Sequence, residues 1–153
     1  IGGYESKHMT MIENISRLSY SMYLNEEAYN ALKQMYDDLY KNTKKRFLVT
    51  SAYKSYDVLN LEENTSQAGY SEFQLGTSVS LKVNGIKDVE FVSTDVYQWL
   101  LEHSYEYGYV LRYPSDKVTI TQKESCNIFR YVGKENAQKM HNQNLCLEEL
   151  NNQ

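Results

Sequence analysis

The segment AGYSEFQLGTSVSL (residues 68–81) contains the features that decide the fold. Gly76 ends a short turn, after which the apolar residues Val79 and Leu81 alternate with the polar residues Ser78 and Ser80. Alternation with a period of two is typical of a strand that buries one face. We therefore predict a strand over residues 78–83, with Ser80 pointing away from the core.

The segments on either side predict a mixture of strands and helices. The Asn84-Gly85 turn predicts a hairpin into a strand at residues 89–92. Further strands are predicted at residues 47–50, 109–112, 117–121 and 127–132, the third of which should pair with the second. Helices are predicted to begin after the caps Asn25 and Thr94 and again at Gly133. Because these elements do not alternate as βαβ units, the fold class is α+β, a small antiparallel sheet with helices packed against it.

Length and composition limit the kind of protein. The 153 residues contain one proline and no long polar spacer, so we expect an extended lead-in at residues 1–24 and a single domain at residues 25–153. The net charge of −4 gives no reason to expect a nucleic-acid partner. No apolar run approaches the roughly 20 residues of a membrane span. Cys126 and Cys146 are too few for a disulfide framework, although one bridge between them stays open.

Four separated segments together resemble the VanY-type D-alanyl-D-alanine carboxypeptidases, a family of zinc peptidases. SAYKSY (residues 51–56) is similar to the family's SGYRSY, and residues 69–81 are similar to GHSEHQTGLAVDL. YGYVLRYP (residues 107–114) is similar to YGFILRYP, and FRYVG (residues 129–133) to the end of EPWHFRYVG. The order and spacing agree from about residue 25 onward, so the resemblance implies the carboxypeptidase fold.

The same resemblance implies a zinc site that this chain has lost. Carried over residue by residue, the family's two His ligands fall on Phe73 and Ile128, its Asp ligand on Ser80, and its Glu general base on Ser125. Zinc requires nitrogen, oxygen or sulfur donors and an open position for water. We therefore predict no catalytic residue, no metal ligand and no cofactor, although zinc is expected for the family.

The substrate-binding positions are retained more completely. Lys54 stands where the resemblance places an arginine for the substrate carboxylate, and it keeps the charge without the planar fork. Ser55, Ser71 and Gln74 keep polar types nearby, and Arg130 matches a family arginine. These five residues are the predicted substrate-binding set.

The resulting hypothesis is a catalytically inactive VanY-like domain that works as a binding or interaction module. The resemblance implies an extracellular or cell-envelope location, and it leaves open an anchor upstream of residue 1. The expected partner is a peptidoglycan stem peptide or another cell-envelope protein. The alternative is an active peptidoglycan D,D-carboxypeptidase with a non-standard site.

Overall fold

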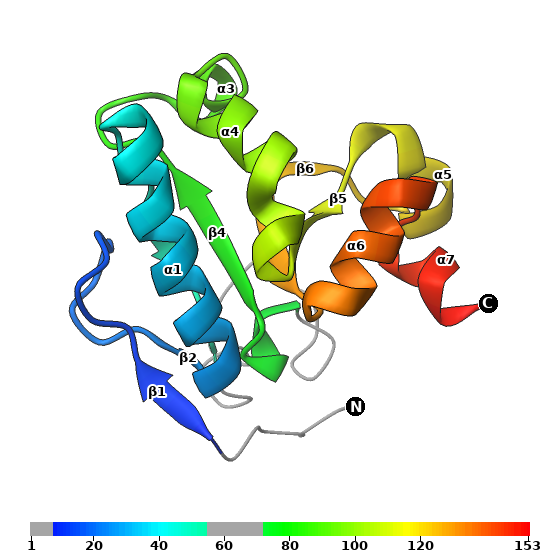
Figure 1. Ribbon diagram of the computed structural model, residues 1–153, viewed down its shortest axis with the longest axis horizontal. Helices are drawn as coiled ribbons and strands as arrows, with labels where there is room; N and C mark the ends of the chain where they lie inside the picture. The colour runs from blue at the N-terminus through cyan, green and yellow to red at the C-terminus, as the bar shows by residue number, and fades with distance from the viewer. Residues whose placement is uncertain (1–7, 55–71) are drawn as a thin grey trace.

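The computed structural model describes residues 8–54 and 72–153, which fold around an antiparallel sheet (Figure 1). The sheet has the order β3-β4-β6-β5, and all of its neighbouring strands are antiparallel. Its strands are β3 (Leu48–Ser51), β4 (Ser78–Lys82), β5 (Tyr109–Tyr113) and β6 (Ser125–Tyr131). A separate antiparallel pair consists of β1 (Met9–Met11) and β2 (Tyr23–Asn25).

Helices pack on the sheet and extend beyond it. The α-helices are α1 (Glu26–Thr43), α3 (Asp88–Phe91), α4 (Asp95–His103), α5 (Val118–Thr121), α6 (Lys134–Gln143) and α7 (Leu147–Asn151). Short 3₁₀ helices are η1 (Glu72–Leu75), η2 (Ser104–Tyr107) and η3 (Ser115–Lys117). Figure 1 shows α1 and α4 lying across the sheet, with α6 and α7 at the side where the chain ends. The predicted α+β class is confirmed.

Helix α1 begins where its sequence predicts. The Asn25 Oδ1 accepts hydrogen bonds from the amides of Glu27 (3.0 Å) and Ala28 (3.4 Å), which satisfies two amides that have no partner inside the helix. The helix ends at Thr43, and the C-cap residue Lys44 adopts a left-handed conformation with φ of 61°. Its buried face, formed by Ala28, Leu32, Met35, Tyr36 and Leu39, supplies much of the core.

Strand β4 is buried on both faces, which corrects the prediction of one exposed face. Val79 and Leu81 have no exposed surface, as expected for the core side. Ser80 does point to the other face, but it is only 7% exposed and Ser78 is 0% exposed. Alternation in the sequence shows which side chains are apolar, but a polar side chain can also be buried when it is hydrogen-bonded. Ser80 bonds to Thr50, and Ser78 bonds to Glu72.

Two predicted strands are helices. Residues 89–92 fall in α3 and the turn after it, where Phe91 packs into the core, and residues 117–121 fall in η3 and α5. Strand β6 pairs with both β4 and β5, and neither of the two segments pairs with the strand that precedes it. Val118 and Ile120 remain 40% and 44% exposed, so their alternation does not mark a buried strand face.

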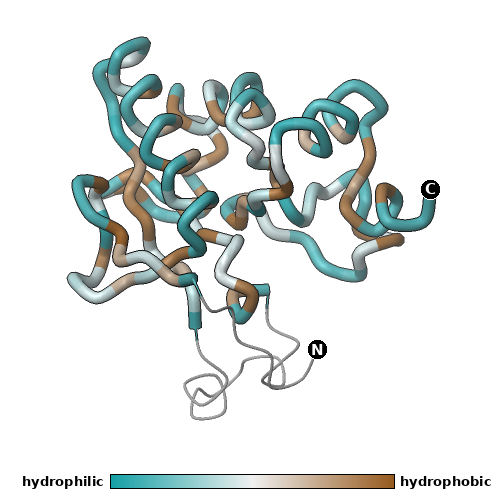
Figure 2. Tube along the Cα trace, turned by 60° about the horizontal axis from the view of Figure 1, so that its bottom comes forward, coloured by the Kyte–Doolittle hydropathy of each residue, from teal (hydrophilic) through white to brown (hydrophobic). Residues whose placement is uncertain are grey.

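The apolar residues concentrate inside the fold, as Figure 2 shows by the hydrophilic colour of the outer turns. A second small cluster joins Val110 to Ala137 and Met140 of α6. Cys126 and Cys146 are both free thiols. Within the part of the chain that the structure describes, no helix has the length and apolar character needed to cross a membrane.

Candidate functional site

Two of the three positions to which the family resemblance assigns zinc ligands lie side by side in the sheet. Ser80 of β4 lies opposite Ile128 of β6 in the strand register, and Phe73 lies in η1 just before β4. We call Phe73, Ser80 and Ile128 the former ligand positions. Ser125 begins β6 and pairs with Tyr113 of β5.

Three of the side chains at these positions contact neighbouring residues. The Ser80 and Thr50 hydroxyls lie 2.7 Å apart, and the Ser125 hydroxyl donates to Asn127 Oδ1 over 2.8 Å. Ile128 is 8% exposed and carries no donor atom. The Phe73 ring centroid lies 5.7 Å from the Lys54 ammonium.

This arrangement does not fit a zinc ion of the family's kind. The former ligand positions offer no imidazole, thiolate or carboxylate, which are the groups that hold zinc in proteins. Across residues 8–54 and 72–153, no group of three or more His, Cys, Asp or Glu side chains is placed to hold a metal.

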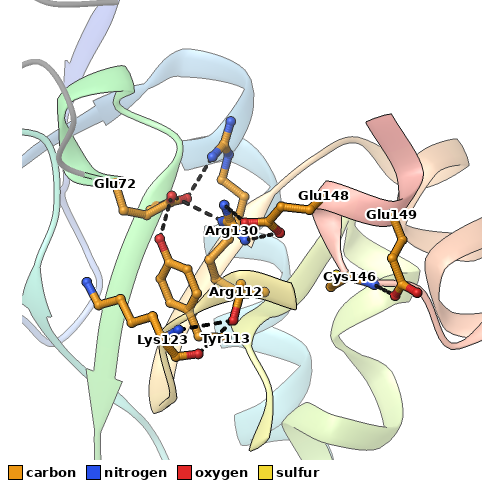
Figure 3. A network of polar contacts seen from close by, with 10 residues as sticks. Glu72, Arg112, Tyr113, Lys123, Arg130, Cys146, Glu148 and Glu149 are labelled. Carbon is orange, nitrogen blue, oxygen red and sulfur yellow. Dashed lines mark hydrogen bonds and ion pairs between the residues drawn. The ribbon is translucent and has the colours of Figure 1, made fainter. Parts of the chain in front are cut away.

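A buried carboxylate lies beside these positions, at the start of the same segment. Glu72 Oε2 accepts hydrogen bonds from the Ser78 hydroxyl (2.6 Å) and from Arg130 Nη1 (2.7 Å). Its Oε1 accepts from Arg112 Nε (3.1 Å) and from the Tyr113 hydroxyl (3.2 Å). Figure 3 shows Arg112, Tyr113 and Arg130 converging on the Glu72 carboxylate from β5 and β6. The Glu72 side chain is 7% exposed, so its charge is held by protein groups instead of water.

The same cluster fastens the C-terminal helix to the sheet. Arg112 uses Nη1 and Nη2 to bind both carboxylate oxygens of Glu148 in α7, at 2.9 and 3.0 Å. This two-bond geometry is the strong form of an arginine–carboxylate pair. Arg112 therefore connects Glu72 to Glu148 (Figure 3).

The electrostatics keep Glu72 charged at neutral pH. Burial by itself raises the pKa of Glu72, but the charge of Arg130, the hydrogen bond from Ser78 and the charge of Arg112 together lower it below the ordinary value of 4.5. Burial, followed by the nearby Glu72 charge, raises the pKa of Tyr113 to about 12. Tyr113 thus remains a hydrogen-bond donor to Glu72 over the physiological range.

The predicted substrate-binding residues are placed in different ways. Arg130 is committed to Glu72 and is 18% exposed. Gln74 is 1% exposed in η1. Lys54 lies beside Phe73, whose carbonyl accepts from the Lys54 amide over 3.2 Å. Ser55 and Ser71 lie outside the described residues, so the complete set stays a prediction.

A cavity of about 400 Å³ opens beside Lys54. Hydroxyl-bearing side chains dominate its lining, and Lys54 is the charged residue among them. The lining residues are Ser19, Ser21, Met22, Thr50, Ser51, Ala52, Tyr53 and Lys54.

Sequence reasoning missed the cluster formed by Glu72, Arg112 and Glu148. The available signal was an acidic residue a few positions before a predicted strand, together with arginines in two other predicted strands. Glu72 meets Arg112 and Arg130 across sequence separations of 40 and 58 residues. Only the tertiary structure shows that these charges face one another.

Comparison with known proteins places the chain in a family. The VanY family, described as D-alanyl-D-alanine carboxypeptidase, matches residues 58–134. A D-alanyl-D-alanine carboxypeptidase from Enterococcus faecium is 32% identical over 152 residues, covering 94% of this chain and 49% of the relative. One from Enterococcus faecalis is 45% identical over 86 residues, covering 55% of this chain and 31% of the relative. The chain belongs to the VanY family, as the sequence segments predicted, and spans half or less of the length of these two relatives.

Solved structures agree with this assignment. The LdcB LD-carboxypeptidase, whose structure concerns peptidoglycan recognition, superposes with a TM-score of 0.89 at 29% identity, covering 99% of this chain and 80% of that one. VanYB in complex with D-alanine-D-alanine superposes with a TM-score of 0.78 at 27% identity, covering 99% of this chain and 92% of VanYB. A mutant of the D,D-pentapeptidase VanY in complex with Zn(II) superposes with a TM-score of 0.71 at 29% identity, covering 90% of this chain and 88% of that one. The carboxypeptidase fold is therefore retained.

Proposed function

We propose that this chain is a non-catalytic VanY-family domain that binds a peptidoglycan stem peptide at the cell envelope. The observation that carries the proposal is the chemistry at the former ligand positions. The family's hydrolysis needs a metal that lowers the pKa of a bound water and polarises the carbonyl. Phe73, Ser80 and Ile128 offer no ligand set for that metal, and the base position is Ser125, whose hydroxyl is already bonded to Asn127.

Binding is supported by the surroundings of Lys54. Its ammonium supplies a positive charge at the edge of the hydroxyl-lined cavity of about 400 Å³. A peptide that ends in D-alanine presents a carboxylate, which a lysine can bind as a point charge, and amides that hydroxyl groups can contact. The similar structures of VanYB, in complex with D-alanine-D-alanine, and of LdcB, which concerns peptidoglycan recognition, support this class of ligand.

The competing function is an active D,D-carboxypeptidase with a non-standard site. The names of the E. faecium and E. faecalis relatives favour it. The two functions differ in two measurable properties, the zinc content of the purified chain and the release of D-alanine.

One experiment separates them. Metal analysis is combined with an assay for D-alanine release from a muropeptide ending in D-alanyl-D-alanine, with and without added zinc. We expect no stoichiometric zinc and no release. Stoichiometric zinc together with turnover would overturn the non-catalytic assignment.

The binding half of the proposal has its own test. The same muropeptide is titrated into the labelled protein by NMR, using the wild type, Lys54→Ala and the control Lys139→Ala, which removes an exposed lysine on α6. We expect shifts around Lys54 that are lost in Lys54→Ala and kept in Lys139→Ala. No shift near Lys54 in the wild type would contradict peptide binding and favour a domain that contacts another protein.

A further inference from the structure

A cavity of about 540 Å³ lies between helix α1 and the segment that joins β1 to β2 (Figure 1). We call it the α1 cavity. Most of its lining side chains carry a hydroxyl, an amide or a charge, and the lining residues are Asn14, Ile15, Ser16, Tyr36, Asp37, Tyr40 and Arg46. None of them lines the cavity beside Lys54, so the two cavities have separate walls.

The wall formed by residues 14–16 is anchored on both sides. The Ser16 amide donates to the Tyr36 hydroxyl over 3.2 Å, and the hydroxyls of these two residues lie 2.9 Å apart. The Ser16 carbonyl accepts from the Val49 amide of β3 over 2.9 Å. Just before the wall, the Tyr29 hydroxyl of α1 donates to the Glu13 carbonyl over 2.9 Å. The shape of the α1 cavity is therefore set by bonds to both α1 and the sheet.

Arg46 brings a positive charge to this cavity. Its guanidinium carbon lies 4.0 Å from the centroid of the Tyr40 ring, which is the geometry of a cation–π interaction. The Lys44 ammonium lies 5.5 Å from the same centroid. Within residues 8–54 and 72–153, neither cation has a hydrogen bond or an ion pair from its side chain. The ring therefore holds the exposed guanidinium in place while its N–H donors stay available to a ligand.

The acidic side chain among the lining residues, Asp37, does not cancel this charge. Both of its carboxylate oxygens accept from the Lys33 ammonium, at 2.7 and 2.8 Å. The carbonyl of Tyr40, near the negative end of α1, accepts from the Lys44 amide over 2.8 Å. Since Asp37 and this carbonyl have partners, the charge offered to a ligand is positive. Each Asp37 oxygen still has lone-pair capacity for a hydroxyl donor.

The polar lining favours an anion that also carries hydroxyl groups. A fully ionised phosphate has no proton to donate to Asp37, whereas a sugar hydroxyl both donates and accepts. The Asn14 amide and the Ser16 hydroxyl can likewise bond to sugar hydroxyls, and both residues are exposed. The volume lies within the range of about 300–1,000 Å³ that is typical of small-molecule sites.

We propose that the α1 cavity binds an anionic saccharide, a sugar ring that carries a phosphate or a carboxylate. Arg46 binds the anionic group through its planar set of N–H donors, which suits the oxygens of both groups. Asn14, Ser16 and Asp37 bond the hydroxyls of the ring. The α1 cavity does not include Lys54, so the inference does not depend on the proposed function.

The test is an NMR titration of the labelled protein with glucose 6-phosphate and with glucuronate, using glucose and inorganic phosphate as controls. We expect shifts at residues 14–16, 37–40 and 46 with at least one of the two anionic sugars, and the tighter of the two identifies the recognised group. Glucose and phosphate alone should each bind at least about tenfold more weakly. Equal binding of either control, or no binding of both anionic sugars at about 10 mM, would overturn the proposal.

Three variants locate the site. Arg46→Gln removes the charge inside the cavity and should weaken binding about tenfold or more. Its control, Lys41→Gln, removes an exposed charge from the last turn of α1 outside the lining and should change binding less than about twofold. Asn14→Gly tolerates the φ of 60° while removing the amide, and should also weaken binding.

The amide spectrum of each variant reports whether the fold is kept. Equal losses in Arg46→Gln and Lys41→Gln would show general attraction of anions to this end of α1 and would overturn the proposed site. Wild-type affinity in Asn14→Gly together with wild-type affinity in Arg46→Gln would also overturn it.

Discussion

Replacing Glu72 by glutamine tests how much the buried charge cluster stabilises the fold. Glutamine keeps the size of the side chain but removes the negative charge between Arg112 and Arg130. All three side chains are largely buried, with exposures of 7% for Glu72, 10% for Arg112 and 18% for Arg130. Breaking a buried pair by removing one partner costs about 3–5 kcal/mol, and we expect Glu72→Gln to lose free energy of unfolding in that range.

A matched control is available in the same network. Glu148 binds the same arginine, Arg112, but its side chain is 33% exposed. Water can therefore compensate for part of the interaction that is lost when the Glu148 charge is removed. We expect Glu148→Gln to cost only about 1 kcal/mol. Urea denaturation followed by circular dichroism gives both free energies. A loss below about 1 kcal/mol in Glu72→Gln, or equal losses in the two variants, would refute the view that the buried Glu72 carboxylate stabilises the sheet.

The pH dependence of this difference adds an independent check. The pKa of Glu72 is lower in the folded protein than its ordinary value of 4.5, because Arg130, Ser78 and Arg112 outweigh the effect of burial. The unfolded chain therefore takes up the proton first as the pH falls, and the stability that Glu72 contributes is lost below its ordinary pKa. The difference between the wild type and Glu72→Gln should stay constant between about pH 6 and 7 and narrow below about pH 4.5. A difference that is the same at pH 3.5 and at pH 7 would contradict this assignment.

Three further changes have definite expected outcomes. Gly108→Ala should lower the free energy of unfolding by about 2 kcal/mol or more, because φ is +88° and the new Cβ would lie 2.7 Å from a ring carbon of Tyr131. The control Gly85→Ala has a similar φ of +82° with no described atom within 4 Å, so it should lower the free energy of unfolding less. Thermal unfolding of the two variants measures the difference. Asn25→Ala removes the cap of α1 and should lower the free energy of unfolding by about 1 kcal/mol. The control Asn30→Ala, on the exposed face of α1, should leave it unchanged. Equal losses in urea denaturation would contradict the capping role of Asn25. The triple variant Phe73→His, Ser80→Asp, Ile128→His should bind zinc, which metal analysis detects. If the wild type contains as much zinc as this variant, the residues Phe73, Ser80 and Ile128 do not prevent metal binding.

The sequence predicted the larger features of the fold because they depend on local patterns. Asn25 caps a helix whose apolar face repeats with helical spacing, and the structure shows that cap and that face. The errors at residues 89–92 and 117–121 arose because short apolar alternation does not say which strand is available as a partner. In the structure, β6 is the strand that pairs with both β4 and β5.

For the site, the sequence by itself determined which chemical groups are present. Side-chain chemistry at Phe73, Ser80 and Ile128 is a local property, so the prediction that the zinc ligands are lost rests on the residues and the family resemblance alone. The tertiary structure decided how the remaining charges are used. It buries Glu72 between Arg112 and Arg130, and it places residues 14–16 beside α1, where Arg46 lines the cavity between them. Both outcomes depend on which segments lie side by side, and that arrangement is set by packing across the whole domain, not by any single segment.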